Sequence, residues 1–201
     1  VLMIRVGCYN WFHDRTDSSV ISDIFQDCDV VLLQRFPEVL CEAFGKSEYR
    51  TNWNQHGMLS KGADKIQYHE LPNNAVSPNQ SQGKFIPILS IGDIKIINCL
   101  PSYDHPGATE QLDYLMSLVD DNTVLAGDMH WTDRRINRLY IKHQLTNHMQ
   151  MDTFTGQRGQ RLSLDKILTR SGLTISDIVV HDEQATNNIE HYPYEFTIHE
   201  K

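Results

Sequence analysis

The stretch T-V-L-A-G-D-M-H-W-T-D-R, residues 123–134, decides the fold of this chain. Residues 123–126 form a short apolar run that predicts a buried strand, which leads directly into Gly127 and Asp128. A helix is expected to begin near Asp133. Asp128 therefore follows a buried strand, where its carboxylate either caps the next turn or belongs to a functional site.

The segments before this stretch predict a helix and a hairpin. Residues 107–121 form the clearest helix of the sequence, because four apolar residues recur on one face. They are Leu112, Leu115, Met116 and Val119. Residues 85–90 and 94–100 predict two strands joined by a turn at Gly92-Asp93. Residues 70–84 are rich in Asn, Gln, Pro and Ser and predict a loop.

The two ends of the chain continue the alternation of strands and helices. Strands are expected at residues 4–9, 29–34, 57–61, 166–169 and 194–198. A helix is expected from Ser18, and a second short helix after Pro37. This order predicts an α/β fold in which two sheets pack face to face and helices cover the outside.

Six segments at or near strand ends occur in an order that resembles a known superfamily. They are residues 9–10, 33–35, 97–100, 125–130, 163–168 and 190–193. This order resembles the endonuclease/exonuclease/phosphatase superfamily, whose pattern runs Asn, L-Q-E, T-H, G-D-x-N, L-D-x-x-L and S-D-H. Residues 107–111 and 127–134 look most like the 5′-tyrosyl-DNA phosphodiesterases. The resemblance implies one domain over residues 1–201, a four-layer α/β/β/α sandwich of the deoxyribonuclease I-like type.

Several catalytic positions of the superfamily keep their residue type in this chain. Asn10 matches the first-strand Asn, Gln34 the Gln of L-Q-E, and Asp128 the carboxylate of G-D-x-N. Asp165 and His191 match a pair in which the Asp orients the His. In the family, Mg²⁺ polarises the phosphate, the His acts on the phosphate or on proton transfer, and G-D-x-N positions the attacking water. The resemblance implies vestigial versions of these roles for Asn10, Asp128, Asp165 and His191.

Other catalytic positions have changed. Arg35 replaces the metal-binding Glu of L-Q-E, and Leu100 replaces the His of T-H. His130 replaces the Asn of G-D-x-N, and Glu190 replaces the Asp of S-D-H. Arg35 changes the site most, because a guanidinium is always protonated and cannot bind a metal ion. Arg35 is expected to pair with Asp128 or Glu190, or to hold a phosphate. His130 and Trp131 are expected at the surface or in packing, with a ligand pocket as the alternative.

These changes favour a catalytically inactive protein that is kept as a binding or structural subunit of a larger assembly. Its exposed loops, residues 70–84 among them, are candidate contacts with protein partners. No metal or other cofactor is expected. The alternative is an Mg²⁺-dependent phosphodiesterase or nuclease with a modified site. Binding of nucleic acid without cleavage is a third possibility, which the net charge of −8 disfavours.

Composition restricts the class of protein. With 40% hydrophobic residues the chain can form a core, and no segment is apolar enough to cross a membrane. Residues 1–6 do not resemble a signal peptide, and the absence of an initiator Met leaves an upstream segment open. The four cysteines form no C-x-x-C pair and are expected to be buried free thiols. An intracellular location is therefore expected, with the compartment open.

Overall fold

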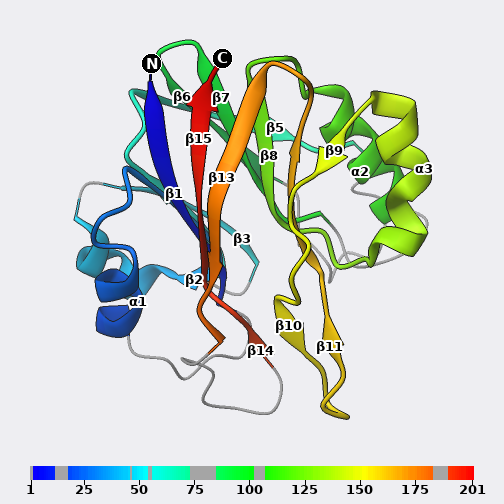
Figure 1. Cartoon of the computed structure of the whole chain (residues 1–201). Helices are drawn as coiled ribbons and strands as arrows, with labels where there is room; N and C mark the ends of the chain where they lie inside the picture. The colour runs from blue at the N-terminus through cyan, green and yellow to red at the C-terminus, as the bar shows by residue number, and fades with distance from the viewer. Residues whose placement is uncertain are drawn as a thin grey trace.

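The computed structural model consists of two large β-sheets packed face to face, with helices against each outer face (Figure 1). It describes residues 2–11, 18–45, 47–53, 56–72, 85–101, 107–182 and 190–201; the side chains of residues 18, 43, 50–53, 56, 57 and 190 are not included. The predicted α/β/β/α sandwich is confirmed.

The first sheet has six strands. In spatial order they are β13 (Leu173–Val180), β15 (Tyr194–Glu200), β1 (Met3–Asn10), β2 (Val30–Pro37), β4 (His56–Lys61) and β3 (Glu48–Trp53). Strand β1 runs parallel to β2 and antiparallel to β15. The parallel register places Asn10 directly beside Gln34. The outer strand β13 is irregular: its pairing with β15 shifts between Ser176 and Val179, and Asp177 has a positive φ of 51°.

The second sheet also has six strands. In spatial order they are β5 (Lys65–Glu70), β6 (Phe85–Ile91), β7 (Ile94–Cys99), β8 (Thr123–Asp128), β12 (Asp165–Thr169) and β9 (Thr146–Asn147). The antiparallel register of β8 and β12 places Asp128 opposite Asp165. A small third sheet contains β11 (Arg161–Leu162), β10 (Phe154–Thr155) and β14 (Glu190–His191).

Three apolar clusters fill the three interfaces between the four layers. Helix α1 (Ser18–Ile24) and the 3₁₀ helix η1 (Glu38–Phe44) pack on the outer face of the first sheet. Helices α2 (Gly107–Ser117) and α3 (Asp133–His143) cover the outer face of the second sheet, on the opposite side of the molecule (Figure 1). The third cluster lies between the sheets. Strands β2 and β8 are buried on both faces, which explains their nearly continuous apolar sequences, whereas β1 is buried on both faces only from Val6 onward.

The predicted helix over residues 107–121 is too long at its C-terminal end. Helix α2 stops at Ser117, and a turn follows it because the Asp120 carboxylate accepts hydrogen bonds from Asn122 N (3.0 Å) and from the Thr123 hydroxyl (2.5 Å). The predicted loop over residues 70–84 begins too early, because Glu70 is the last residue of β5. Residues 73–84 of that loop lie outside the described part of the chain.

The other strand and helix predictions are confirmed within one to three residues, including the hairpin of β6 and β7. None of the described helices combines the length and apolar character that crossing a membrane requires. All four cysteines are free thiols. Cys8 and Cys99 are buried as predicted, whereas Cys28 and Cys41 are only half-buried.

Candidate functional site

The interior between the two sheets changes from apolar to polar at one end. Along β1, Cys8 belongs to the apolar cluster, and two residues later Asn10 is buried and polar. On β8 the same step leads from Ala126 to Asp128. Asn10 Nδ2 donates a hydrogen bond to Asp128 Oδ2 across the sandwich (2.7 Å), which confirms that the two residues lie at the same end.

Gly127 allows the second sheet to hold Asp128 in this position. Its φ is +135°, a region that residues with a Cβ rarely adopt. A Cβ at this position would lie 2.3 Å from the carbonyl oxygen of Cys99 on the neighbouring strand β7. The backbone of β7 therefore approaches β8 closely where the strand ends, and glycine is required for packing as well as for conformation.

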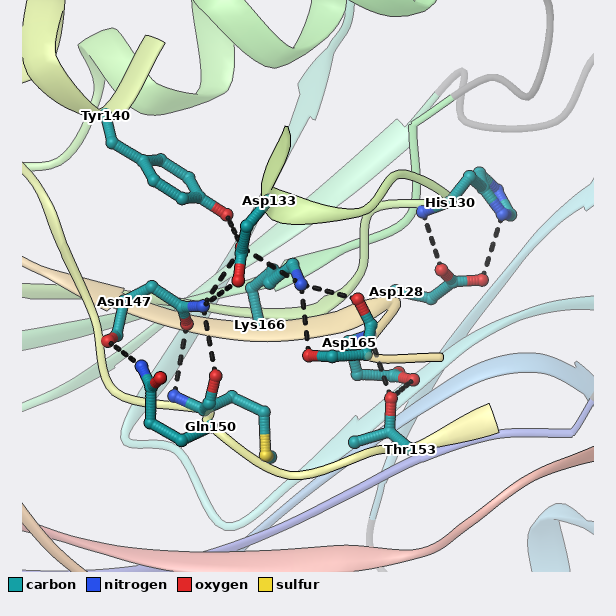
Figure 2. Close-up of polar contacts among 11 residues, drawn as sticks. Asp128, His130, Asp133, Tyr140, Asn147, Gln150, Thr153, Asp165 and Lys166 are labelled. Carbon is teal, nitrogen blue, oxygen red and sulfur yellow. Dashed lines mark hydrogen bonds and ion pairs between the residues drawn. The ribbon is translucent and has the colours of Figure 1, made fainter. Parts of the chain in front are cut away.

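The Asp128 carboxylate is fully buried and both of its oxygens contact N–H donors or imidazole nitrogens. Oδ1 accepts a hydrogen bond from the backbone N–H of His130 (2.7 Å). Oδ2 lies 3.0 Å from Nδ1 of the His130 ring and 3.5 Å from Nε2 of His191, in addition to its contact with Asn10. Figure 2 shows His130 folded back on Asp128.

The charges around Asp128 keep it ionised. Burial by itself raises the pKa of this carboxyl group, but His130, His191 and Arg35 together hold the pKa well below its usual range. The expectation that His130 lies at the surface is therefore wrong. Its side chain is 6% exposed and pairs with Asp128. Trp131 is buried in the cluster beneath α2 and α3, so its expected role in packing is confirmed.

Asp165 and His191 form the contact that the resemblance implies. Asp165 Oδ2 lies 2.9 Å from His191 Nδ1 and accepts a hydrogen bond from the Thr153 hydroxyl (2.7 Å). Phe154 packs against the imidazole, with ring centroids 4.7 Å apart. Burial lowers the pKa of His191, but Asp165 and Asp128 outweigh it, so that the pKa is raised. The small sheet thus fixes the orientation of the His191 ring through Thr153 and Phe154.

Arg35 lies in a bulge at the end of β2. The pairing of β2 with β4 shifts between Leu33 and Phe36, and Arg35 has a positive φ of 53°. A bulge turns a side chain out of the regular alternation of the strand. Burial lowers the pKa of Arg35, while Asp128 opposes this shift. Conversely, the Arg35 charge lowers the pKa of both Asp128 and His191. Of the two predicted partners of Arg35, Asp128 is thus within electrostatic reach.

The remaining candidate positions lie around this centre. Gln34 Nε2 donates to Asn98 Oδ1 (2.7 Å) behind Asn10, and both residues are buried. Leu100, at the position of the family His, is buried in the apolar cluster of the second sheet. The backbone of Glu190 pairs with Thr155 in the small sheet, but its side chain lies outside the described part of the structure.

A second polar network behind Asp128 and Asp165 centres on Lys166 (Figure 2). The Lys166 side chain is fully buried, and its ammonium lies 3.1 Å from Asp133 Oδ1 and 2.5 Å from the carbonyl of Ser163. Asp133, the first residue of α3, also accepts hydrogen bonds from Tyr140 and Asn147. Lys166 thus ties the start of α3 to the start of β12. Sequence reasoning missed this cation; its one signal is a lysine inside the apolar strand D-K-I-L-T.

Removing either partner of this ion pair is expected to affect stability unequally. Asp133→Ala is expected to lower the free energy of unfolding by about 2 kcal/mol, because it leaves the buried ammonium without its counter-charge. Lys166→Met is expected to cost about 1 kcal/mol or less, because Asp133 is half exposed and water can replace the ammonium. Urea unfolding of both variants measures the difference. A larger loss for Lys166→Met would contradict this account.

The described side chains do not fit a divalent metal ion. Mg²⁺ requires about six oxygen ligands, including at least one carboxylate. Both oxygens of Asp128 are already engaged, and Oδ2 of Asp165 holds His191 and Thr153. Oδ1 atoms of Asn10 and Asp165 are buried without a hydrogen-bond partner, but the Arg35 charge repels a cation from this region. Within the described residues, no three His, Cys, Asp or Glu side chains are grouped to hold a metal.

Comparison with known proteins identifies the fold. Neither a protein-family model nor the sequence of a curated protein matches the chain. Solved structures match over nearly its full length. An endonuclease/exonuclease/phosphatase family protein from Leptotrichia buccalis C-1013-b has a TM-score of 0.74 at 11% identity, covering 98% of this chain and 99% of that one.

Two further matching structures are of TDP2. D. rerio TDP2 complexed with single strand DNA product has a TM-score of 0.70 at 11% identity and covers 99% of this chain and 100% of that one. Truncated Caenorhabditis elegans TDP2 has a TM-score of 0.70 at 15% identity, covering 98% and 97%. The chain therefore has the endonuclease/exonuclease/phosphatase fold that the six segments predict.

Proposed function

We propose that this chain, which has the endonuclease/exonuclease/phosphatase fold, does not cleave phosphate esters and serves as a binding or structural subunit of a larger intracellular assembly. The observation that carries the proposal is the state of Asp128. In the family pattern this carboxylate has to interact with the attacking water. Here the backbone and ring of His130, together with Asn10, satisfy both of its oxygens. Four free cysteines support a reducing compartment.

Arg35 supports the same conclusion independently. It stands where the family has a metal-binding Glu, and its charge already compensates Asp128. A divalent ion placed here would meet a fixed positive charge in a largely desolvated region, where like charges repel by several kcal/mol. The electrostatic role that Mg²⁺ has in the family is thus taken over by residues of the chain, so the site keeps its structure without the ion.

The runner-up is a metal-dependent phosphodiesterase with a modified site, of the kind represented by tyrosyl-DNA phosphodiesterases. One observation favours it: Asp165, His191 and Thr153 form an intact hydrogen-bonded chain. The raised pKa of His191 suits a group that donates a proton or stabilises a phosphate near neutral pH. Loss of one stabilising donor typically slows an enzyme about 100- to 1000-fold, so the retained pair alone does not restore turnover.

Metal binding and cleavage together test the proposal. Titration of the protein with Mg²⁺ or Mn²⁺ in a calorimeter is expected to give no saturable heat at millimolar concentrations. Cleavage of single-stranded DNA, RNA, a 5′-tyrosyl oligonucleotide and a generic phosphodiester is expected to match that of Asp128→Ala. The Arg35→Glu variant is expected to bind Mn²⁺ measurably, because it removes the repelling charge and adds a carboxylate.

The matched control is Arg158→Glu, which makes the same charge change at an exposed turn and is expected to add no metal binding. Metal-dependent cleavage that disappears in His191→Ala would contradict the proposal and establish the runner-up. Unchanged metal affinity in Arg35→Glu would show that more than one position excludes the ion.

A further inference from the structure

The outer face of α3 carries positive charge and no acidic residue. It consists of Arg134, Arg135, Asn137, Arg138, Ile141 and Lys142, all exposed, while Ile136 and Tyr140 point into the core. The only acidic residue of the helix, Asp133, is turned toward Lys166 instead (Figure 2). At 3.6 residues per turn, Arg134, Arg138 and Ile141 align along the middle of this face.

The arginines of this face differ from several other cations of the chain. Arg5 is paired with Glu195, Arg161 with Asp182 and Lys95 with Asp120. Within the ranges that the structure describes, Arg134 and Arg138 form no ion pair, and Arg135 lies only over the ring of Trp131, 5.9 Å from its centroid. Lys142, at the C-terminal end of the face, is paired with Asp113 of α2. In a chain of net charge −8, Arg134 and Arg138 in the middle of the α3 outer face are therefore uncompensated positive charges.

Ile141 adds an apolar element to this face. Its side chain is 71% exposed, one turn beyond Arg138. Single exposed apolar residues are ordinary. An isoleucine in line with two unpaired arginines on one helix face nevertheless matches a ligand that carries negative charge and an apolar side chain together.

We propose that the α3 outer face docks an acidic protein segment that also carries an apolar residue. This inference rests on the proposed function, a subunit of a larger assembly, and names the chemistry of the partner. Two carboxylates of the segment would pair with Arg134 and Arg138, where arginine offers two parallel donors to a carboxylate. An apolar side chain of the segment would cover Ile141 and bury apolar surface.

Net charge and the burial of Trp131 favour a protein segment over a nucleic acid as the ligand of this face. A polynucleotide carries one negative charge per nucleotide, and the acidic remainder of this chain repels such a polyanion. An acidic peptide places a few charges locally and meets less of this repulsion. Proteins that bind single-stranded nucleic acid commonly stack its bases on aromatic side chains, whereas Trp131 beside this face is buried.

Binding of defined probes to the purified full chain tests the proposal. The probe is a fluorescein-labelled 15-residue peptide of Glu and Leu, and an all-Glu peptide and oligo-dT15 serve as comparisons. Fluorescence anisotropy at 50 mM salt is expected to show that the Glu/Leu peptide binds most tightly. Arg134→Glu combined with Arg138→Glu is expected to weaken its binding about tenfold or more. Ile141→Ala is expected to weaken the Glu/Leu peptide about fivefold and to leave the all-Glu peptide unchanged.

Matched variants separate this face from general charge effects. Lys65→Glu combined with Arg158→Glu makes the same change in net charge at two exposed positions elsewhere and is expected to change binding less than twofold. Val39→Ala changes another highly exposed apolar residue and is the control for Ile141.

Equal weakening by both double variants would overturn the proposal. Tighter binding of oligo-dT15 would also overturn it, as would the absence of peptide binding at about 1 mM, a concentration at which even a weak complex forms. Concentration-dependent self-association that Arg138→Glu abolishes would make a second copy the occupant and also overturn it. The metal and cleavage assays are run on the same protein. If the protein cleaves a phosphodiester and also binds the peptide, only the proposed function is refuted.

Discussion

The Gly127→Ala variant is expected to lose about 4 kcal/mol or more of its free energy of unfolding. Two costs add at this position. A side chain at φ +135° costs about 1–3 kcal/mol in backbone strain. A Cβ 2.3 Å from the Cys99 carbonyl oxygen forces β7 and β8 apart, and such overpacking costs about 1–3 kcal/mol, occasionally more. Because Asp128 follows directly, the contact between Asn10 and Asp128 is expected to be lost as well.

Gly92→Ala is the matched control. Gly92 lies in the turn between β6 and β7 with a φ of +54°, and a Cβ there meets no atom within 4 Å. This variant therefore carries the conformational cost without the steric one and is expected to lose about 1 kcal/mol. Chemical denaturation of both variants measures the two losses. Similar losses would show that the close approach of β7 and β8 is not what requires glycine at position 127.

The Asp128→Asn variant is expected to lose about 3–5 kcal/mol. It keeps the shape of the side chain but removes the negative charge that compensates Arg35 and His191 in the interior. Asp113→Asn is the control, because Asp113 contacts Lys142 and His143 at 2.6 Å but is 35% exposed. Exposed ion pairs contribute about 0–1 kcal/mol, so this variant is expected to lose no more than that. Equal losses would refute the importance of burial at Asp128.

The free energy of unfolding of the parent and of Asp128→Asn is expected to depend on pH with a defined sign. The pKa of Asp128 is lowered on folding, so its contribution is complete above the unfolded-state value of about 4 and is lost as the pH falls toward the folded value. The pKa of His191 is raised, so its contribution is complete below about 6.5 and is lost as the pH rises through the folded value. Asp128→Asn should therefore be least destabilised, relative to the parent, in strong acid. Unfolding curves from pH 2 to 9 measure this difference.

The sequence predicted where strands end, and with them most of the centre of the site. Asp128 follows the continuous apolar run of β8, which is typical of a strand buried on both faces. Asn10 follows residues 4–9, whose alternation predicts a strand. The contact between Asp165 and His191 was implied by the resemblance alone, because no local pattern brings residues 26 positions apart together. Their roles in any chemistry stay predictions.

The features that the sequence did not predict depend on backbone detail and on neighbours in space. His130 and Arg35 both have positive φ, and no local signal such as glycine marks their positions. The His130 side chain folds back on Asp128 instead of lying at the surface. For Arg35 the electrostatic effect on Asp128 is one of the expected outcomes, and only the bulge that carries Arg35 is not predicted. The strands β3, β5 and β13 were not predicted, and all three lie at an outer end of their sheet. In β5 and β13 partial exposure weakens the apolar pattern.

The irregularity in β13 also bears on how the folded protein behaves at high concentration. A strand at the border of a sheet presents unpaired N–H and C=O groups that can recruit the same strand of another molecule and begin aggregation. In β13 the register shift between Ser176 and Val179, with Asp177 in a left-handed conformation, breaks the spacing of those groups in mid-strand and adds a negative charge. A neighbouring molecule finds only short matching segments on either side, so the half-exposed Val179 does not lie on a continuous template.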